Sequence, residues 1–276
     1  MKLLRIVKYD LVEGTIRNWY KFLIVILIAY ISTNLFHLRL ERLNEPGLIC
    51  SEGTVMDYIM YSMEGLPVYK FDPYSSFYVP IYWFVFQIWI SYIVAYYPEN
   101  NFRSCGKNIF LASKSRVKWW LSKCLWCVIN VVVYFIVYYV AVTVFSYIKG
   151  AELSFNFTEN IMSICYGDNL KYLYNREALF LVLVLPCVTT IAISIFQILL
   201  AFLFTPVISF AMICGLYVIS TYYTNELLIG SYTMWLRSSY VNIEGVNPEI
   251  GLLISLLLVF GSVLAGCIKF DRKDVF

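Results

Sequence analysis

The fold is decided by residues 178–223, which read ALFLVLVLPCVTTIAISIFQILLAFLFTPVISFAMICGLYVISTYY and contain no Asp, Glu, Lys, Arg or His. A helix needs roughly 20 apolar residues to cross the hydrocarbon core of a bilayer. This run is about twice that length, so we interpret it as two crossings. Thr205-Pro206 is its strongest helix breaker and predicts a tight hairpin near Ala201–Val207. Pro186 lies within the first of the two crossings and has no N–H to donate to the carbonyl one turn before it. A neighbouring helix can supply a hydrogen-bond donor to that carbonyl instead.

Four more apolar runs accompany this one. They are Phe22–Phe36, Phe77–Tyr97, Cys124–Ile148 and Ile250–Ile268. Hydrophobic residues make up 61% of the chain and charged residues 14%, whereas soluble domains are about a quarter charged. We therefore expect an all-α polytopic membrane protein, with six transmembrane helices in a single domain over residues 1–276.

Lys and Arg are distributed unevenly over the loops, and cytoplasmic loops carry the excess. If the N-terminus is cytoplasmic, the inside segments carry a net charge of +9 and the outside loops −6. We therefore expect both termini to lie in the cytoplasm. The membrane that we expect is the plasma membrane of a bacterium. The net charge does not indicate nucleic-acid binding. The inside segments hold 14 of the 21 basic residues: Lys2, Arg5, Lys8, Arg17, Lys21, Arg103, Lys107, Lys114, Arg116, Lys118, Lys123, Lys269, Arg272 and Lys273.

Residues 1–20 are basic and amphipathic. Leu3, Leu4, Val7, Leu11 and Ile16 fall near one face of a helix, which predicts a helix lying in the membrane interface. The alternative is a basic flank that only sets topology. No small-residue cleavage site follows the first apolar run, so we interpret that run as a retained anchor.

The first outside loop, residues 37–76, is too apolar for a disordered linker, and we expect it to fold against the outer ends of the helices. Cys50 in this loop and Cys165 in the next can pair if the compartment oxidises thiols, and two free thiols are the alternative. Cys124 and Cys127 form a CxxC without a second pair or a nearby histidine. We interpret these two as helix-packing residues rather than metal ligands.

Deep within the crossings there is no Asp, Glu, Lys or Arg, whereas ion-coupled carriers usually keep ionisable groups there. Gln87, Asn130 and Gln197 are the main polar side chains, and they either line a substrate path or hydrogen-bond between helices. The chain has one histidine, His37, and neither a G-x-S-x-G nor a G-x-x-x-x-G-K-[ST] motif. We expect no enzymatic activity of its own and no directly bound metal or cofactor.

Residues 98–123, PENNFRSCGKNIFLASKSRVKWWLSK, form the most informative loop. It is basic, falls on the cytoplasmic side, and has helical periodicity before a break at Ser113–Ser115. It then runs directly into the third crossing.

Here the chain resembles the type-two ABC export permeases. Members have an N-terminal interfacial helix, six crossings, and a first cytoplasmic loop with a Gly-containing helix, a Ser-Arg step and a Lys entering the third crossing. The matching residues are Gly106, Ser115-Arg116 and Lys123, together with Lys8-Tyr9-Asp10-Leu11 near the start and the tail from Lys269 to Asp274.

The resemblance implies a permease subunit that pairs with a second copy or a homologue and with two separate ATPase subunits, which bind the ATP and Mg²⁺. Residues 98–123 would then contain a coupling helix that contacts the ATPase. Its contact residues would be Phe102, Arg103, Gly106, Lys107, Ile109, Phe110, Leu111 and Arg116. The alternative for the charges is that they meet anionic lipid.

As a class these permeases export amphipathic cargo such as peptides and bacteriocins, drugs or lipid-like molecules. A competing hypothesis is a membrane scaffold or sensor that does not transport and binds a partner through its extracellular loops. Attachment of an ATPase distinguishes the two.

Overall fold

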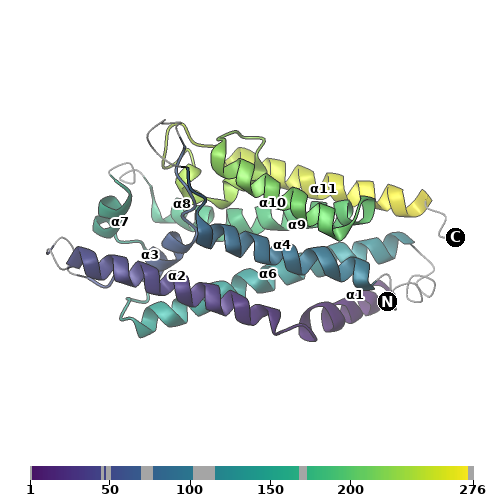
Figure 1. Cartoon of the computed structure of the whole chain (residues 1–276), viewed down its shortest axis with the longest axis horizontal. Helices are drawn as coiled ribbons and strands as arrows, with labels where there is room; N and C mark the ends of the chain where they lie inside the picture. The colour runs from purple at the N-terminus through teal and green to yellow at the C-terminus, as the bar shows by residue number, and fades with distance from the viewer. Residues whose placement is uncertain are drawn as a thin grey trace.

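The computed structural model describes residues 2–44, 47, 51–69, 77–101, 116–167 and 173–272. Within these ranges the chain is helical and has no β-strand, since extended residues meet only in two isolated bridges. Figure 1 shows the long helices lying side by side in one elongated bundle. The all-α class expected from the sequence is confirmed.

The long helices of the bundle are α2 (Lys21–Asn44), α4 (Ile81–Asn101), α6 (Arg116–Ile148), α9 (Leu185–Leu203), α10 (Pro206–Tyr222) and α11 (Pro248–Arg272). The shorter elements are α1 (Lys2–Leu11), η1 (Val12–Ile16), α3 (Val55–Ser62), α7 (Glu159–Tyr166), α8 (Asn175–Leu179), η4 (Phe180–Val184), η5 (Ile229–Thr233) and η6 (Trp235–Arg237).

Four of the described helices are long and apolar enough to cross a membrane. They are Lys21–Asn44, Arg116–Ile148, Asn175–Leu203, which joins α8, η4 and α9, and Pro248–Asp271. The shorter apolar helix α10 has 17 residues, and α4 has 21 but carries many Tyr and Trp residues and Gln87. Membrane character is thus supported by length and hydropathy together.

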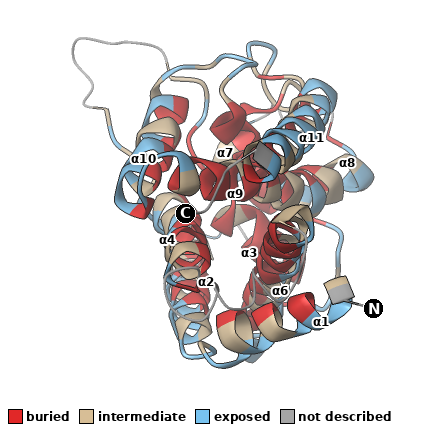
Figure 2. Cartoon of the chain, turned by 90° about the vertical axis from the view of Figure 1, so that its right-hand side faces the viewer, coloured by how far each residue is buried: buried red, intermediate tan, exposed pale blue. Residues whose placement is uncertain are grey.

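Helix α9 occupies the centre of the bundle, because it contacts α4, α6, α10 and α11. Its buried face includes Ala192, Ile193 and Ile198. Figure 2, viewed along the bundle, shows buried residues on the inward sides of the helices and exposed residues around the rim. Many exposed residues at the rim are large and hydrophobic, among them Leu253, Leu257 and Phe260 on α11. A rim of this kind suits a lipid environment rather than water.

The π-helical segment η4 precedes Pro186, which has no N–H to donate to the carbonyl of Val182. The hydroxyl of Tyr139 on α6 donates to that carbonyl oxygen at 2.7 Å. A neighbouring helix therefore satisfies the carbonyl, and this expectation from the sequence is confirmed.

The predicted hairpin near Ala201–Val207 is also confirmed, since α9 ends at Leu203 and α10 begins at Pro206. Thr205 caps α10, because its hydroxyl oxygen accepts from the backbone N–H of Ile208 at 3.3 Å. The Lys269 ammonium donates to the carbonyl of Phe202 at 2.6 Å. The hairpin has no Lys or Arg of its own, and α11 supplies the cation at the C-terminus of α9.

Several predicted boundaries were wrong. Helix α2 continues past Phe36 to Asn44, so residues 37–44 are helical rather than part of a loop. His37 Nε2 and Glu41 Oε1 lie 3.3 Å apart across one turn of this extension. Helix α6 begins at Arg116 rather than near Cys124, because its first turns bury two tryptophans and a lysine against the bundle.

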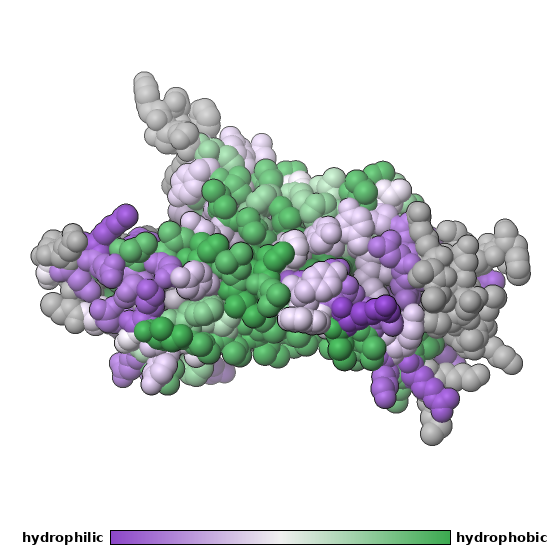
Figure 3. Space-filling model, turned by 60° about the horizontal axis from the view of Figure 1, so that its bottom comes forward, coloured by the Kyte–Doolittle hydropathy of each residue, from purple (hydrophilic) through white to green (hydrophobic). Residues whose placement is uncertain are grey.

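The two ends of the bundle differ. The end that carries α1 and the last turn of α11 is called the termini end here, and the end built by α3, α7, η5 and η6 is called the loop end (Figure 1). Figure 3 shows hydrophobic residues over the middle of one face, with hydrophilic residues gathered toward both ends. This banding matches the apolar core and the polar headgroup layers of a bilayer.

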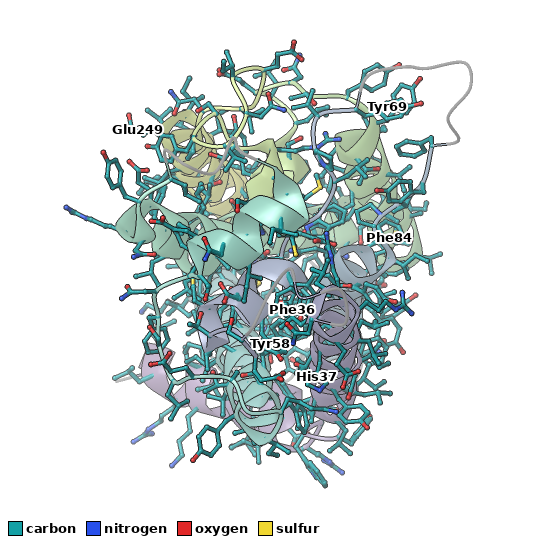
Figure 4. All side chains as sticks on the ribbon, turned by 90° about the vertical axis from the view of Figure 1, so that its left-hand side faces the viewer. Phe36, His37, Tyr58, Tyr69, Phe84 and Glu249 are labelled. Carbon is teal, nitrogen blue, oxygen red and sulfur yellow. The ribbon has the colours of Figure 1, made fainter. Side chains whose placement is uncertain are left out.

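At the loop end, described residues 51–69 fold back onto the bundle, as expected for that part of the first outside loop. Helix α3 packs on α2 and α6, and the Phe36 and Tyr58 rings meet edge to face at 4.8 Å (Figure 4). Asp57 is fully buried and accepts from the backbone N–H groups of Thr54 and Thr158, each at 2.8 Å. One carboxylate thus joins two loops that are distant in sequence.

Candidate functional site

The residues predicted to contact an ATPase lie almost entirely outside the described part of the chain. Arg116 is the exception and stands at the first position of α6. The coupling helix therefore stays a prediction. The undescribed contact residues are Phe102, Arg103, Gly106, Lys107, Ile109, Phe110 and Leu111.

A buried ion pair joins α1 to the first turns of α6. The Lys123 ammonium on α6 donates to Asp10 Oδ1 on α1 at 2.5 Å, and both residues are fully buried. The Ser122 hydroxyl donates to Asp10 Oδ2 at 2.5 Å, and the Tyr97 hydroxyl on α4 donates to Asp10 Oδ1 at 3.0 Å. The carboxylate therefore receives hydrogen bonds from α4 and α6 together.

The Lys123 ammonium has further partners. It donates to Oδ1 of Asn101, the last residue of α4, at 2.8 Å. It also lies 4.9 Å from the centroid of the Tyr97 ring and 5.3 Å from that of the Trp119 ring. These are cation–π distances. Buried charges persist in proteins when they are paired and hydrogen-bonded, and this pair meets both conditions.

Gly14 in η1 allows the N-terminal region to approach α4 and α6 closely. A Cβ atom at this position would lie 2.5 Å from Trp126 Nε1 and 2.8 Å from the Tyr97 ring. The Trp126 indole donates to Thr15 Oγ1 at 3.1 Å, and the Thr15 hydroxyl donates to Asn130 Oδ1 at 3.1 Å. Polar contacts to α6 thus continue along η1.

Helix α1 and η1 have two apolar surfaces. Ile6 and Val7 are buried against the bundle next to Asp10, whereas Leu4 and Ile16 are 73% and 64% exposed. The predicted apolar face contained Val7, Leu4 and Ile16 together, so the structure divides it. One part packs on α6, and the other remains free to contact lipid.

The three polar residues considered for a substrate path have different hydrogen-bond partners. Gln87 Oε1 accepts from the Thr190 hydroxyl at 3.1 Å, and Gln197 Nε2 donates to the Ser91 carbonyl at 3.1 Å, both between α4 and α9. Asn130 instead faces η1. Each side chain bonds to another element, which agrees with the alternative of interhelical hydrogen bonding. The path stays a prediction.

The cysteines form no site in the described residues. Cys50 lies outside them, so its pairing with Cys165 stays a prediction. Cys124 and Cys127 are buried, and no group of three His, Cys, Asp or Glu residues that could hold a metal occurs within the described ranges. Their burial agrees with the packing interpretation.

Sequence reasoning did not foresee that Asp10 and Lys123 pair, and counted both as charges of the inside face. A signal was nevertheless present, since each belongs to a motif that carries the family resemblance. Arg237 was also missed. It is fully buried in η6, and its guanidinium donates to the carbonyls of Ser220, Thr221, Tyr223 and Leu66.

Comparisons with models of protein families, with curated proteins and with solved structures found no match for this chain. A functional conclusion therefore depends on the residues themselves and on their geometry.

Proposed function

We propose that this chain is the transmembrane permease subunit of an ATP-driven exporter of the type-two ABC class, working with ATPase subunits supplied as separate chains. The observation that supports it best is the buried pair of Asp10 and Lys123. Asn101 and Lys123 lie near the two ends of the predicted coupling segment, residues 98–123, and their side chains are hydrogen-bonded to each other at 2.8 Å. Both ends of that segment are thus tied to the N-terminal helix at one point.

This arrangement suits mechanical coupling. A partner that binds ATP can shift the permease between two conformations only if it binds them with different affinity. A contact on segment 102–115 would act on α4 and α6 directly and on α1 through Asp10. A buried ion pair is either formed or broken, because a separated charge is costly in a dry interior. The three helices would therefore move together.

Six crossings are part of the proposal. Four spans satisfy both length and hydropathy, and α4 and α10 pack beside them against α9. The hairpin between α9 and α10 lies beside Lys269 near the end of α11, and therefore on the termini side of the bundle. With the N-terminus in the cytoplasm, this connectivity also puts the C-terminus there. The membrane would be the bacterial plasma membrane.

The cargo that we propose is amphipathic: a peptide or bacteriocin, a drug, or a lipid-like molecule. Among the described residues, the bundle interior near its middle is aromatic and uncharged, as in the contact of Phe86 with Tyr134 and Tyr138. ATP and Mg²⁺ would bind to the two ATPase subunits, and a second permease copy or a homologue would complete the transporter. The chain would then have no enzymatic activity of its own.

The proposal is tested by purifying the tagged full-length chain from membranes of its native host. We expect two copies of a subunit with a G-x-x-x-x-G-K-[ST] motif and Mg²⁺-dependent ATP hydrolysis in the same complex. The double substitution Arg103→Glu and Lys107→Glu should lower the amount of that subunit without lowering membrane insertion. A matched control, Lys149→Glu with Arg176→Glu, makes the same charge change at the loop end.

A membrane scaffold or sensor remains the competing function, and the ordered loop end favours it, since Asp57 holds two loops in one fold. If the purified complex lacks an ATPase but retains a partner that is released by substitutions at the loop end, the scaffold is the better description. Equal ATPase recovery from the Arg103/Lys107 variant and the wild type would remove these two residues from the contact.

A further inference from the structure

A polar cavity of about 570 Å³ lies at the termini end, between η1 with its following turn and the last turns of α4. Its lining consists of four tyrosines, three asparagines, Glu13, Arg17 and Lys21. Tyrosine hydroxyls and asparagine amides are hydrogen-bond donors as well as acceptors. Several of these donors already bond within the protein, since the Tyr97 hydroxyl donates to Asp10, the Tyr20 hydroxyl to Asn18, and the Asn18 amide to the Glu13 carbonyl. The cavity therefore offers a polar lining together with two cations.

The charge of the cavity is positive. Arg17 pairs with Glu13 one turn away, with Nη1 and Oε2 at 3.1 Å, and the guanidinium remains largely exposed. No carboxylate of the described residues lies within ion-pair distance of the Lys21 ammonium. One positive charge is thus left over in a polar site, which suits a ligand with a single negative charge.

The surroundings of the cavity are those of a membrane interface. Trp19 and Tyr20 are 63% and 54% exposed beside it, and Leu23 on the next turn is 51% exposed. Trp and Tyr concentrate where headgroups meet the hydrocarbon core, and apolar residues follow on the core side. The cavity therefore lies at the depth of the lipid phosphates when α2 spans the membrane.

We propose that this cavity binds the phosphodiester headgroup of an anionic phospholipid. The Lys21 ammonium and the Arg17 guanidinium neutralise the phosphate, and the second N–H of the Asn18 amide donates to one of its oxygens. The acyl chains extend along the exposed apolar surface that begins at Leu23. This inference does not depend on an ATPase partner.

Lipid binding at this place acts on the buried ion pair. Tyr97 and Asn101 line the cavity, and the same side chains contact Asp10 and Lys123. A ligand that binds the folded protein stabilises it in proportion to its affinity. A bound headgroup therefore stabilises the contact of α1 with α4 and α6, which makes the lipid a regulator of that contact.

The test uses the purified full-length chain in a neutral detergent. Thermal unfolding is measured while phosphatidylglycerol, phosphatidylcholine or inorganic phosphate is added. We expect phosphatidylglycerol to raise the unfolding temperature more than phosphatidylcholine does, and inorganic phosphate to have little effect. In the double variant Arg17→Gln and Lys21→Gln, the apparent affinity for phosphatidylglycerol should fall by at least about tenfold.

Lys118→Gln is the matched control for the single variant Lys21→Gln, because Lys118 is an exposed cation on α6 that does not line the cavity. An equal loss of affinity in this control would indicate general attraction to anionic lipid and overturn the site. Equal stabilisation by phosphatidylcholine would overturn the preference for an anionic headgroup. Full stabilisation by inorganic phosphate alone would overturn the lipid as the ligand.

If the double variant Arg17→Gln and Lys21→Gln does not fold, a second measurement tests the site. The single variant Lys21→Gln and the wild type are then compared by native mass spectrometry for retained phosphatidylglycerol. Retention in the wild type and its loss in Lys21→Gln supports the site, and equal retention contradicts it.

Discussion

Asn101 and Lys123 flank segment 102–115 in the sequence, and their side chains meet at 2.8 Å. The same ammonium pairs with Asp10, so three helices converge on one lysine. Taking charges out of water is costly, and their mutual attraction repays this cost only when the geometry and the hydrogen bonds are good. The pair is therefore better understood as a device that specifies which helices meet than as a source of net stability.

Lys123→Met should be strongly destabilising, because it leaves the Asp10 carboxylate buried without a cation. Breaking a buried pair on one side typically costs about 3–5 kcal/mol. The double variant Asp10→Asn and Lys123→Met should cost clearly less than the sum of the two single changes. Denaturant unfolding in detergent, followed by circular dichroism, measures all three.

The exposed pair Glu13 and Arg17 provides the control for that cycle. Changing both residues to Gln should alter the free energy of unfolding by about 0–1 kcal/mol, as for surface pairs in general. Additive costs at Asp10 and Lys123 would contradict the coupling inferred from the 2.5 Å contact.

The sequence was sufficient to predict structural features that depend on neighbouring residues in the chain. The break at Thr205-Pro206 could be predicted because proline and the capping threonine act on their own neighbours. The pairing of Asp10 with Lys123 could not, since 113 positions separate them and periodicity reports only which face a residue occupies. The extra turns of α2 beyond Phe36 were missed for a related reason. Hydropathy marks the membrane core, and a helix can continue past it into polar residues, as α2 does from His37 to Asn44.

Tyr139→Phe should destabilise the protein, because the Val182 carbonyl then loses its only side-chain donor among the described residues. An unsatisfied buried carbonyl costs about 1–3 kcal/mol. In the background Pro186→Ala the chain regains an N–H at position 186, so the cost of Tyr139→Phe should shrink. The exposed Tyr147 on α6 gives the control Tyr147→Phe. An unchanged cost in the Pro186→Ala background would show that Tyr139 does not compensate for the proline.

Glu64 should make stability depend on pH. Burial raises the pKa of this carboxyl above its ordinary value of 4.5, although the Tyr166 hydroxyl at 2.6 Å and Arg39 oppose the shift. The Glu64 carboxyl holds its proton more tightly in the folded protein than in the unfolded chain. Its contribution to folding stability is therefore fully present below pH 4.5 and is lost as pH rises through the pKa of the folded state. The unfolding midpoint should therefore fall less between about pH 5 and about pH 7, a range that lies above 4.5, in Glu64→Gln than in the wild type.

Glutamine at position 64 can still accept from Tyr166, so the comparison isolates the charge. Glu159→Gln is the control, since Glu159 is an exposed carboxylate at the same loop end. A change in pH dependence as large in the control as in Glu64→Gln would show that Glu64 is not the group responsible.

Arg237 should tolerate no replacement, including Lys. It is fully buried, and it donates to Leu66 at 3.0 Å, to Tyr223 at 2.9 Å, and to the carbonyls of Ser220 and Thr221. Three of these carbonyls belong to the open C-terminus of α10, which a cation stabilises through the helix dipole. Burial lowers the pKa of Arg237 to about 10, so the side chain stays charged at neutral pH.

An ammonium cannot reproduce the planar fork of a guanidinium, and the carbonyls that it leaves unpaired are buried. Arg237→Lys should therefore cost about 2–4 kcal/mol of unfolding free energy. Hydrogen exchange should rise at the end of α10 and in residues 64–69 more than in α6. Arg176→Lys, at an exposed arginine of α8, is the control and should leave both measurements unchanged. A stable Arg237→Lys variant with unaltered exchange at the end of α10 would show that this helix is held by its packing on α4 and α9 alone.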